Sequence, residues 1–121
     1  NICKKNHRLD GLTAAAEYEN TIIRKTLKTY KFKFVKELHI PLANLIINNT
    51  GTEDILLPQN KFDFIVPVPL HRKRLNWRGF NQSELVALKL SEYFNIPINR
   101  DILIRVKNTP PQSKTKSKKE R

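Results

Sequence analysis

The chain has 121 residues and a formal net charge of +12, from 23 Lys and Arg against 11 Asp and Glu. No apolar run approaches the roughly 20 residues of a membrane span, and no signal-peptide pattern opens the chain, so we expect a cytoplasmic protein without a membrane partner. The single cysteine, Cys3, excludes an intramolecular disulfide framework. The basic excess predicts an anionic partner, which could be a small phosphate compound, a weakly associated nucleic acid or an acidic protein surface. A genomic bias toward Lys, Asn and Ile is the alternative source of this charge.

The beginning of the chain carries little apolar patterning. The sequence has no methionine and ends in a lysine-rich stretch, so we expect an internal fragment of a longer protein. Residues 1–18 are polar and then weakly apolar, and Asp10-Gly11 is a good two-residue turn for a short hairpin. A helix through the alanines is the competing prediction. Cys3 is either a free thiol or the last ligand of a zinc module that lay upstream.

Two amphipathic helices are predicted next. Over residues 19–30, apolar side chains recur at i, i+4 and i+7 with Lys and Arg between them. A second apolar stripe over residues 38–46 repeats this spacing, and Pro41 is tolerated there only near the first turn. Residues 48–51, Asn-Asn-Thr-Gly, end the second helix because Asn and Gly accept a left-handed backbone.

Residues 62–69, Phe-Asp-Phe-Ile-Val-Pro-Val-Pro, predict a buried strand because they are aromatic and β-branched. The two prolines fix its end, since neither can donate a ladder hydrogen bond. Residues 70–80 carry His71 and four Lys or Arg with no apolar period, so we predict a loop.

Asn81 then predicts a helix start, with Glu84 at the third position as in a capping box. The buried stripe expected on this helix comprises Val86, Leu90, Tyr93 and Phe94. Residues 102–104, Ile-Leu-Ile, predict a second strand. Strand, loop, helix and strand form a β-α-β unit, which places the two strands parallel in an α/β fold.

In open α/β sheets, ligands bind beyond the carboxyl ends of the strands. The basic loop and the basic tail, residues 105–121, follow those two ends, so we expect two cationic segments to meet at one edge. Guanidinium groups give bidentate contacts to phosphate, and the start of a helix favours an anion. This pattern predicts a phosphate site, with a solvated basic loop as the alternative.

Residues 66–82, VPVPLHRKRLNWRGFNQ, resemble the signature stretch of the ComF-like phosphoribosyltransferase family, which is also described as competence-associated. The resemblance extends upstream through Tyr18 and residues 30–32, and downstream through residues 105–121. It implies a type I phosphoribosyltransferase fold, a mainly parallel sheet with flanking helices, truncated here at both ends. Residues 1–18 would be the remnant after a missing zinc module, and residues 19–121 the N-terminal half of a phosphoribosyltransferase-like domain.

The resemblance also implies a pyrophosphate-facing loop and a mobile loop, and the catalytic residues stay unknown. The substrate-binding residues that it implies are Arg72, Arg74, Arg78, Gly79, Asn81 and Gln82. The mobile loop would contribute Gln112 and Arg121. The full-length family would use Mg²⁺ with phosphoribosyl pyrophosphate, whereas no cofactor is expected in this fragment. The implied reaction is a glycosyl transfer that displaces pyrophosphate.

The acidic pair and Thr/Gly-rich loop that hold the phosphoribosyl group in such enzymes have no counterpart here. The adjacent acids Glu53-Asp54 precede Ile-Leu-Leu-Pro, which cannot cradle a phosphate. We therefore expect this chain to be inactive alone. The alternative is a non-catalytic accessory or nucleic-acid-binding protein in DNA uptake. The three histidines are far apart in the sequence, so no metal site is expected.

Overall fold

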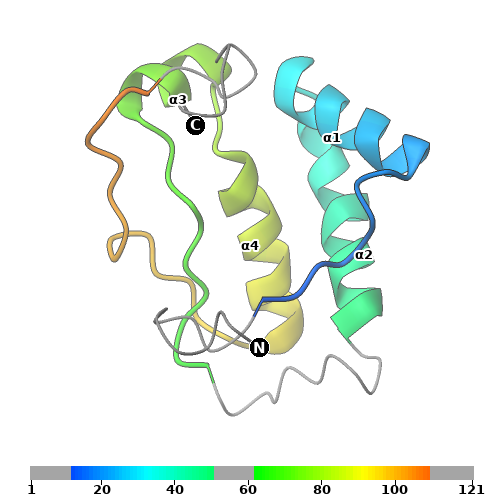
Figure 1. Cartoon of the computed structure of the whole chain (residues 1–121). Helices are drawn as coiled ribbons and strands as arrows, with labels where there is room; N and C mark the ends of the chain where they lie inside the picture. The colour runs from blue at the N-terminus through cyan, green and yellow to red at the C-terminus, as the bar shows by residue number, and fades with distance from the viewer. Residues whose placement is uncertain (1–11, 51–61, 110–121) are drawn as a thin grey trace, which may run out of the picture. The chain divides into compact units, whose positions relative to one another are not determined.

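The computed structural model describes residues 12–50 and 62–109. The chain divides into two compact units, Asn1–Phe62 and Asp63–Arg121. The first contains helix α1 (Thr21–Phe32), the short 3-10 helix η2 (Lys36–Leu38) and helix α2 (His39–Thr50). The second contains helices α3 (Arg72–Arg78) and α4 (Gln82–Phe94), which follow each other closely along the chain (Figure 1).

Helix α1 confirms the first predicted amphipathic helix. The Asn20 side chain begins it by accepting hydrogen bonds from the backbone N–H groups of Ile22 at 2.9 Å and Ile23 at 3.3 Å. Tyr30 is 3% exposed and anchors the apolar face. Burial raises the pKa of the Tyr30 phenol to about 12, because the charged phenolate is poorly solvated inside the protein.

Helix α2 confirms the second predicted helix. Pro41 is the third residue of α2. The backbone N–H groups in the first turn of a helix have no carbonyl partner within the helix, so a proline at this position costs no hydrogen bond. Leu42 and Ala43 follow and are buried, Ala43 completely. The helix extends through Thr50, within the stretch predicted to end it.

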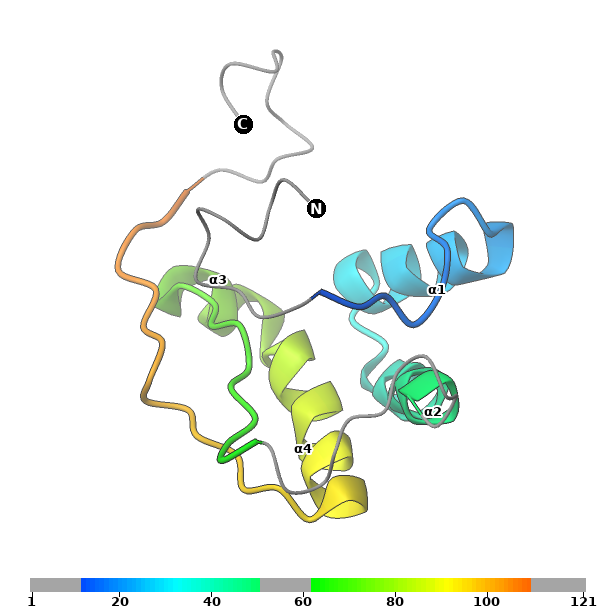
Figure 2. The ribbon, with the colours of Figure 1, turned by 60° about the horizontal axis from the view of Figure 1, so that its bottom comes forward.

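The second unit contains two extended segments. Residues 63–71 lie beside α4, and residues 96–109 run along the side of that segment that faces away from α4 (Figures 1 and 2). They meet at one parallel bridge between Ile65 and Ile98. The Ile65 N–H donates to the Pro97 carbonyl and the Asn99 N–H donates to the Ile65 carbonyl, both at 2.9 Å. This single bridge is parallel, but its partner is Ile98 and not the second strand predicted at residues 102–104.

The predicted fold class, a mainly parallel sheet with flanking helices, is wrong for this structure. The described residues form helices, and their extended segments pair only at Ile65 and Ile98. Pro67 and Pro69 cannot donate to a ladder, which limits pairing beyond Ile65. The predicted second strand at residues 102–104 is also wrong: this segment is unpaired and Ile104 is 78% exposed. The chain instead forms its bridge to Ile65 at Ile98, four residues before residue 102.

The loop predicted over residues 70–80 contains helix α3 instead. His71 Nδ1 accepts a hydrogen bond from the Lys73 N–H at 3.2 Å at its start. Gly79, at φ +80°, ends it in the left-handed conformation, and its N–H donates to the Leu75 carbonyl. A helix of seven residues is too short to show an apolar period, so its caps were the informative signal.

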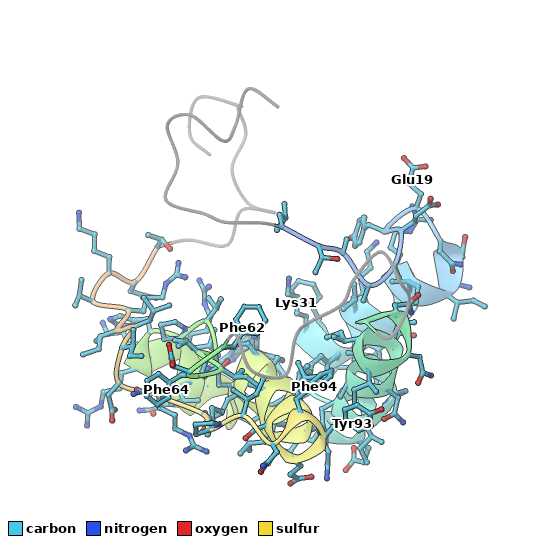
Figure 3. The ribbon with its side chains drawn as sticks, turned by 90° about the horizontal axis from the view of Figure 1, so that it is seen from below. Glu19, Lys31, Phe62, Phe64, Tyr93 and Phe94 are labelled. Atoms are coloured by element: carbon cyan, nitrogen blue, oxygen red, sulfur yellow. The ribbon has the colours of Figure 1, made fainter. Side chains whose placement is uncertain are left out.

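Helix α4 begins after the predicted cap Asn81, whereas Glu84 pairs with Arg100. The Asn81 side chain accepts a hydrogen bond from the Ser83 N–H at 3.2 Å, and Asn95, at φ +53°, closes the other end. The predicted burial of Tyr93 is wrong, since this side chain is 63% exposed. Neighbouring helical residues point about 100° apart, and the half-buried Phe94 takes the inner position. The two rings meet edge to face, with centroids 5.0 Å apart (Figure 3).

Several predictions lie outside the described residues: the hairpin at Asp10-Gly11, the role of Cys3, and the mobile-loop residues Gln112 and Arg121. Residues 12–20 form no strand. Within the two described ranges, no helix has the length and apolar character needed to cross a bilayer.

Candidate anion-binding site

The candidate site is the corner where α3 turns into α4. Gly79 makes this turn possible, because its φ of +80° strains any residue that has a Cβ. A Cβ built at Gly79 would meet no atom within 4 Å. Glycine is therefore needed here for its backbone conformation and not for close packing.

The chain entering α3 is fixed to the start of α4 through the Val68 carbonyl. Asn81 Nδ2 donates to this oxygen at 3.2 Å, and the Ser83 hydroxyl lies 2.5 Å from it. The same hydroxyl lies 2.9 Å from Asn81 Oδ1, and its single proton can be donated to only one of the two acceptors at a time. These contacts hold both ends of the Val68 to Asn81 segment together.

The corner is strongly cationic. Between Asp63 and Glu84 the sequence has four Lys or Arg and no acid. Arg74 and Arg78 are four residues apart on α3, so they lie on one face of the helix. The pKa of Arg78 is lowered, first by burial and then by the positive charge of Arg74. Burial and the charge of Arg74 both disfavour the charged form of Arg78. A bound anion would offset the repulsion between the two arginines.

Hydrogen bonds orient both guanidinium groups. Arg78 Nη1 donates to Gln82 Oε1 at 2.5 Å, and Gln82 is buried at the first position of α4. Arg74 Nη2 donates to the Thr109 carbonyl at 2.7 Å, while Arg105 Nη2 donates to the Thr109 hydroxyl. The start of the basic tail therefore meets α3, as expected, although through a side chain of α3 and not at the edge of a sheet.

The structure brings together five of the predicted residues: Arg74, Arg78, Gly79, Asn81 and Gln82. Arg72 is two residues before Arg74 and points about 160° away from it around the helix, so it does not join this group. Sequence reasoning missed the Val68 carbonyl, Ser83 and the Thr109 carbonyl. The Asn-x-Ser spacing at the start of α4 was a usable signal for Ser83, because both side chains can bond local backbone groups.

The described residues hold no group of three or more His, Cys, Asp or Glu side chains that could bind a metal ion. His71 acts in the structure as the cap of α3. The chemistry that the corner offers is therefore the binding of an anion by guanidinium groups, with no carboxylate between Asp63 and Glu84 to oppose it.

Comparison with known proteins shows similarity to a competence protein. The chain is 35% identical over 88 residues to Competence protein F of Haemophilus influenzae, a match that covers 68% of this chain and 37% of that protein. The matched part thus spans less than two fifths of the relative's length. No protein-family model and no solved structure matches the chain. The similarity supports a ComF-like relationship of the chain.

Proposed function

We propose that this chain is part of a ComF-like, competence-related protein whose α3–α4 corner binds a pyrophosphate group, such as that of phosphoribosyl pyrophosphate. The observation that carries the proposal is the pair Arg74 and Arg78, one helical turn apart and each oriented by a hydrogen bond. The similarity to a protein named Competence protein F supports the first half of the proposal.

The chemistry of the two arginines supports a compact anion with several oxygens. A guanidinium group has five N–H donors in a planar fork, which matches phosphate oxygens. Arg74 uses one of these donors on the Thr109 carbonyl. An anion placed between Arg74 and Arg78 would offset the repulsion that lowers the pKa of Arg78. Oriented side chains also lose less conformational entropy when they bind.

In a phosphoribosyl transfer, negative charge develops on the departing pyrophosphate, and fixed positive groups stabilise it. The corner would supply those groups in the complete protein. The Mg²⁺ that the resemblance implies prefers carboxylate and phosphate oxygens, and residues 64–83 contain no carboxylate. The corner therefore does not fit a metal held by its own side chains.

The test is a titration of the ¹⁵N-labelled chain with pyrophosphate at constant ionic strength. Amide signals from residues 70–82 should shift first and saturate. The variant Arg74→Gln/Arg78→Gln should abolish these shifts. The control Lys33→Gln/Lys89→Gln removes the same charge from exposed or half-exposed positions outside the corner and should leave them unchanged. Equal, unsaturated shifts along all four helices, or the same loss in both variants, would overturn the proposal.

A further inference from the structure

Helix α1 carries a second concentration of positive charge, in the other unit of the chain. Between Glu19 and Glu37 the sequence has six Lys or Arg and no acid. Four of these cations lie on one face of α1, where Lys28 is three or four residues from each of the other three, and all four are exposed. We refer to them as the α1 stripe: Arg24, Lys25, Lys28 and Lys31.

The α1 stripe lies opposite the face that holds α1 in the protein. At 100° per residue, its four members fall within an arc of about 120°, and Tyr30 lies on the other side of the helix. Tyr30 is buried, and Ile23 and Leu27 beside it are half-buried. The stripe is therefore an ordered row of charges whose direction is set by the burial of the opposite face.

The charges of the stripe are uncompensated within the part of the chain that the structure describes. Lys28 has like charges at i−4, i−3 and i+3, a pattern that destabilises a helix. No described carboxylate forms an ion pair with Arg24, Lys25, Lys28 or Lys31, whereas Lys89 on α4 pairs with Glu92 at 2.6 Å. A polyanionic partner would convert this repulsion into attraction.

From this arrangement we infer that the α1 stripe is a docking surface for the phosphate backbone of double-stranded nucleic acid. The stripe extends over eight residues, and its seven steps of 1.5 Å give about 10 Å along the helix axis. One strand of a duplex presents a phosphate about every 3.4 Å along its axis, so the stripe matches about three phosphates. The inference uses residues of α1 alone and does not rest on pyrophosphate binding at the α3–α4 corner.

Two other classes of partner fit the stripe less well. Lysine, which supplies three of its four charges, is depleted at protein–protein interfaces but makes phosphate contacts readily. A helix that lies on a membrane inserts its apolar face into the lipid, and the apolar face of α1 is anchored by the buried Tyr30. Phe32, which is 55% exposed, is the one aromatic side chain of α1 within the arc of the stripe. A single ring favours a duplex over unpaired bases, because successive bases would need several aromatic side chains for stacking.

The test measures binding of the full chain to a fluorescent 20-base-pair DNA duplex over a series of KCl concentrations. Each phosphate contact contributes about −0.9 to the slope of log affinity against log salt. The variant Lys25→Gln/Lys28→Gln/Lys31→Gln should therefore make the slope shallower by about 2.7. The control Lys89→Gln/Arg100→Gln/Lys107→Gln, which lowers the net charge by the same amount, should retain the original slope.

Three results would overturn the inference. The first is an equal change of slope in the α1 variant and its control, which would indicate net charge without a defined surface. The second is tighter binding of a 20-nucleotide single strand than of the duplex through the same residues. The third is unchanged duplex binding in the α1 variant combined with lost binding to vesicles of anionic phospholipid.

Two further measurements keep these outcomes separate from other failures. Circular dichroism should show full helix content in the α1 variant, since Gln and Lys have similar helix propensities, and Lys28→Arg should retain the wild-type slope. Pyrophosphate binding should persist in the α1 variant, and duplex binding should persist in Arg74→Gln/Arg78→Gln. Failure of one surface is thereby distinguished from failure of the other.

Discussion

Helices α1 and α3 are both basic, and they differ in what holds their cations. On α1, three of the four cations in the stripe are lysines, exposed and without a described partner. On α3, Arg74 and Arg78 donate hydrogen bonds to the Thr109 carbonyl and to Gln82. Flexible ammonium groups attract an extended anion through charge, whereas oriented guanidinium groups select a compact anion by shape. The same residue class therefore suits two different ligands.

The two helices also differ in how they are anchored. Helix α1 has the buried Tyr30 on its inner face. Helix α3 has no buried residue, and the residues at its two ends define it. His71 begins α3, Gly79 ends it, and Asn81 ties the next helix to the Val68 carbonyl. The fold of α1 should therefore depend on side-chain burial, and that of α3 on caps and hydrogen bonds.

High pH should act on the α1 anchor and produce the largest effect. The pKa of Tyr30 is raised to about 12 in the folded chain from an ordinary value of 10.0. Its stabilising contribution is complete below pH 10 and is lost as the pH rises to about 12, because the unfolded chain loses this proton first. At 1.36 kcal/mol per unit of pKa, the loss is about 2 to 3 kcal/mol. Urea unfolding at pH 9 and pH 12 measures it.

The matched variant for this prediction is Tyr30→Phe, which keeps the ring and removes the titrating hydroxyl. It should abolish most of that pH dependence, and it should remove the component near pH 12 from the absorbance titration at 295 nm. An unchanged pH dependence in Tyr30→Phe would show that another group is responsible and that Tyr30 does not anchor α1 in this way.

Removal of the Arg78 guanidinium should weaken pyrophosphate binding at the proposed site on α3. A hydrogen bond to a charged group contributes about 1.5 to 3 kcal/mol, so Arg78→Ala should raise the pyrophosphate dissociation constant about 10- to 100-fold. Arg78→Lys should recover only part of the loss, because lysine lacks the planar fork. Calorimetric titration compares both with Lys33→Ala. Full recovery by lysine would mean that charge alone binds the anion.

The caps of the two units provide a smaller, direct comparison. Asn20 accepts hydrogen bonds at the start of α1, and Asn81 does so at the start of α4 while also donating to the Val68 carbonyl. Replacement of either by Ala should cost about 1 kcal/mol for the cap, and Asn81 should cost up to about 1 kcal/mol more for its second contact. Thermal unfolding measures the difference. Asn81→Asp retains the acceptor and should lose only the second part.

Local signals in the sequence predicted the local structure well. Asn81 was identified as a cap because a short polar side chain before an apolar pattern satisfies free backbone N–H groups. Helix α3 was missed because a helix of two turns shows no period, although His71 and Gly79 marked its ends. The exposed position of Tyr93 was missed because spacing alone does not reveal which of two adjacent rings turns inward.

The sheet could not be predicted from the same signals, because strand pairing is not local. Residues 102–104 have the composition of a strand, yet the chain pairs at Ile98, where the Asn99 N–H and the Pro97 carbonyl flank Ile65. The contact between Arg74 and Thr109 is separated by 35 residues and depends on the path between them. The sequence predicted that the two basic segments meet, but it did not predict that Arg74 and the Thr109 carbonyl join them.

The smallest expected effect tests whether the α1 stripe has a cost to folding. Lys28→Gln removes repulsion from Arg24, Lys25 and Lys31, and like-charge pairs at this spacing destabilise a helix by about 0.2 to 0.5 kcal/mol each. Because these side chains are exposed, the lower end of that range applies to all three pairs, and unfolding stability at low salt should rise by about 0.6 kcal/mol while duplex affinity falls. Lys89→Gln is the matched control, because Lys89 sits in an attractive pair with Glu92, and its loss should leave stability unchanged or slightly lower. Opposite signs for stability and binding at Lys28 would identify charges that oppose folding and favour a partner. A loss of stability in Lys28→Gln would instead show that the lysine contributes to the fold of α1.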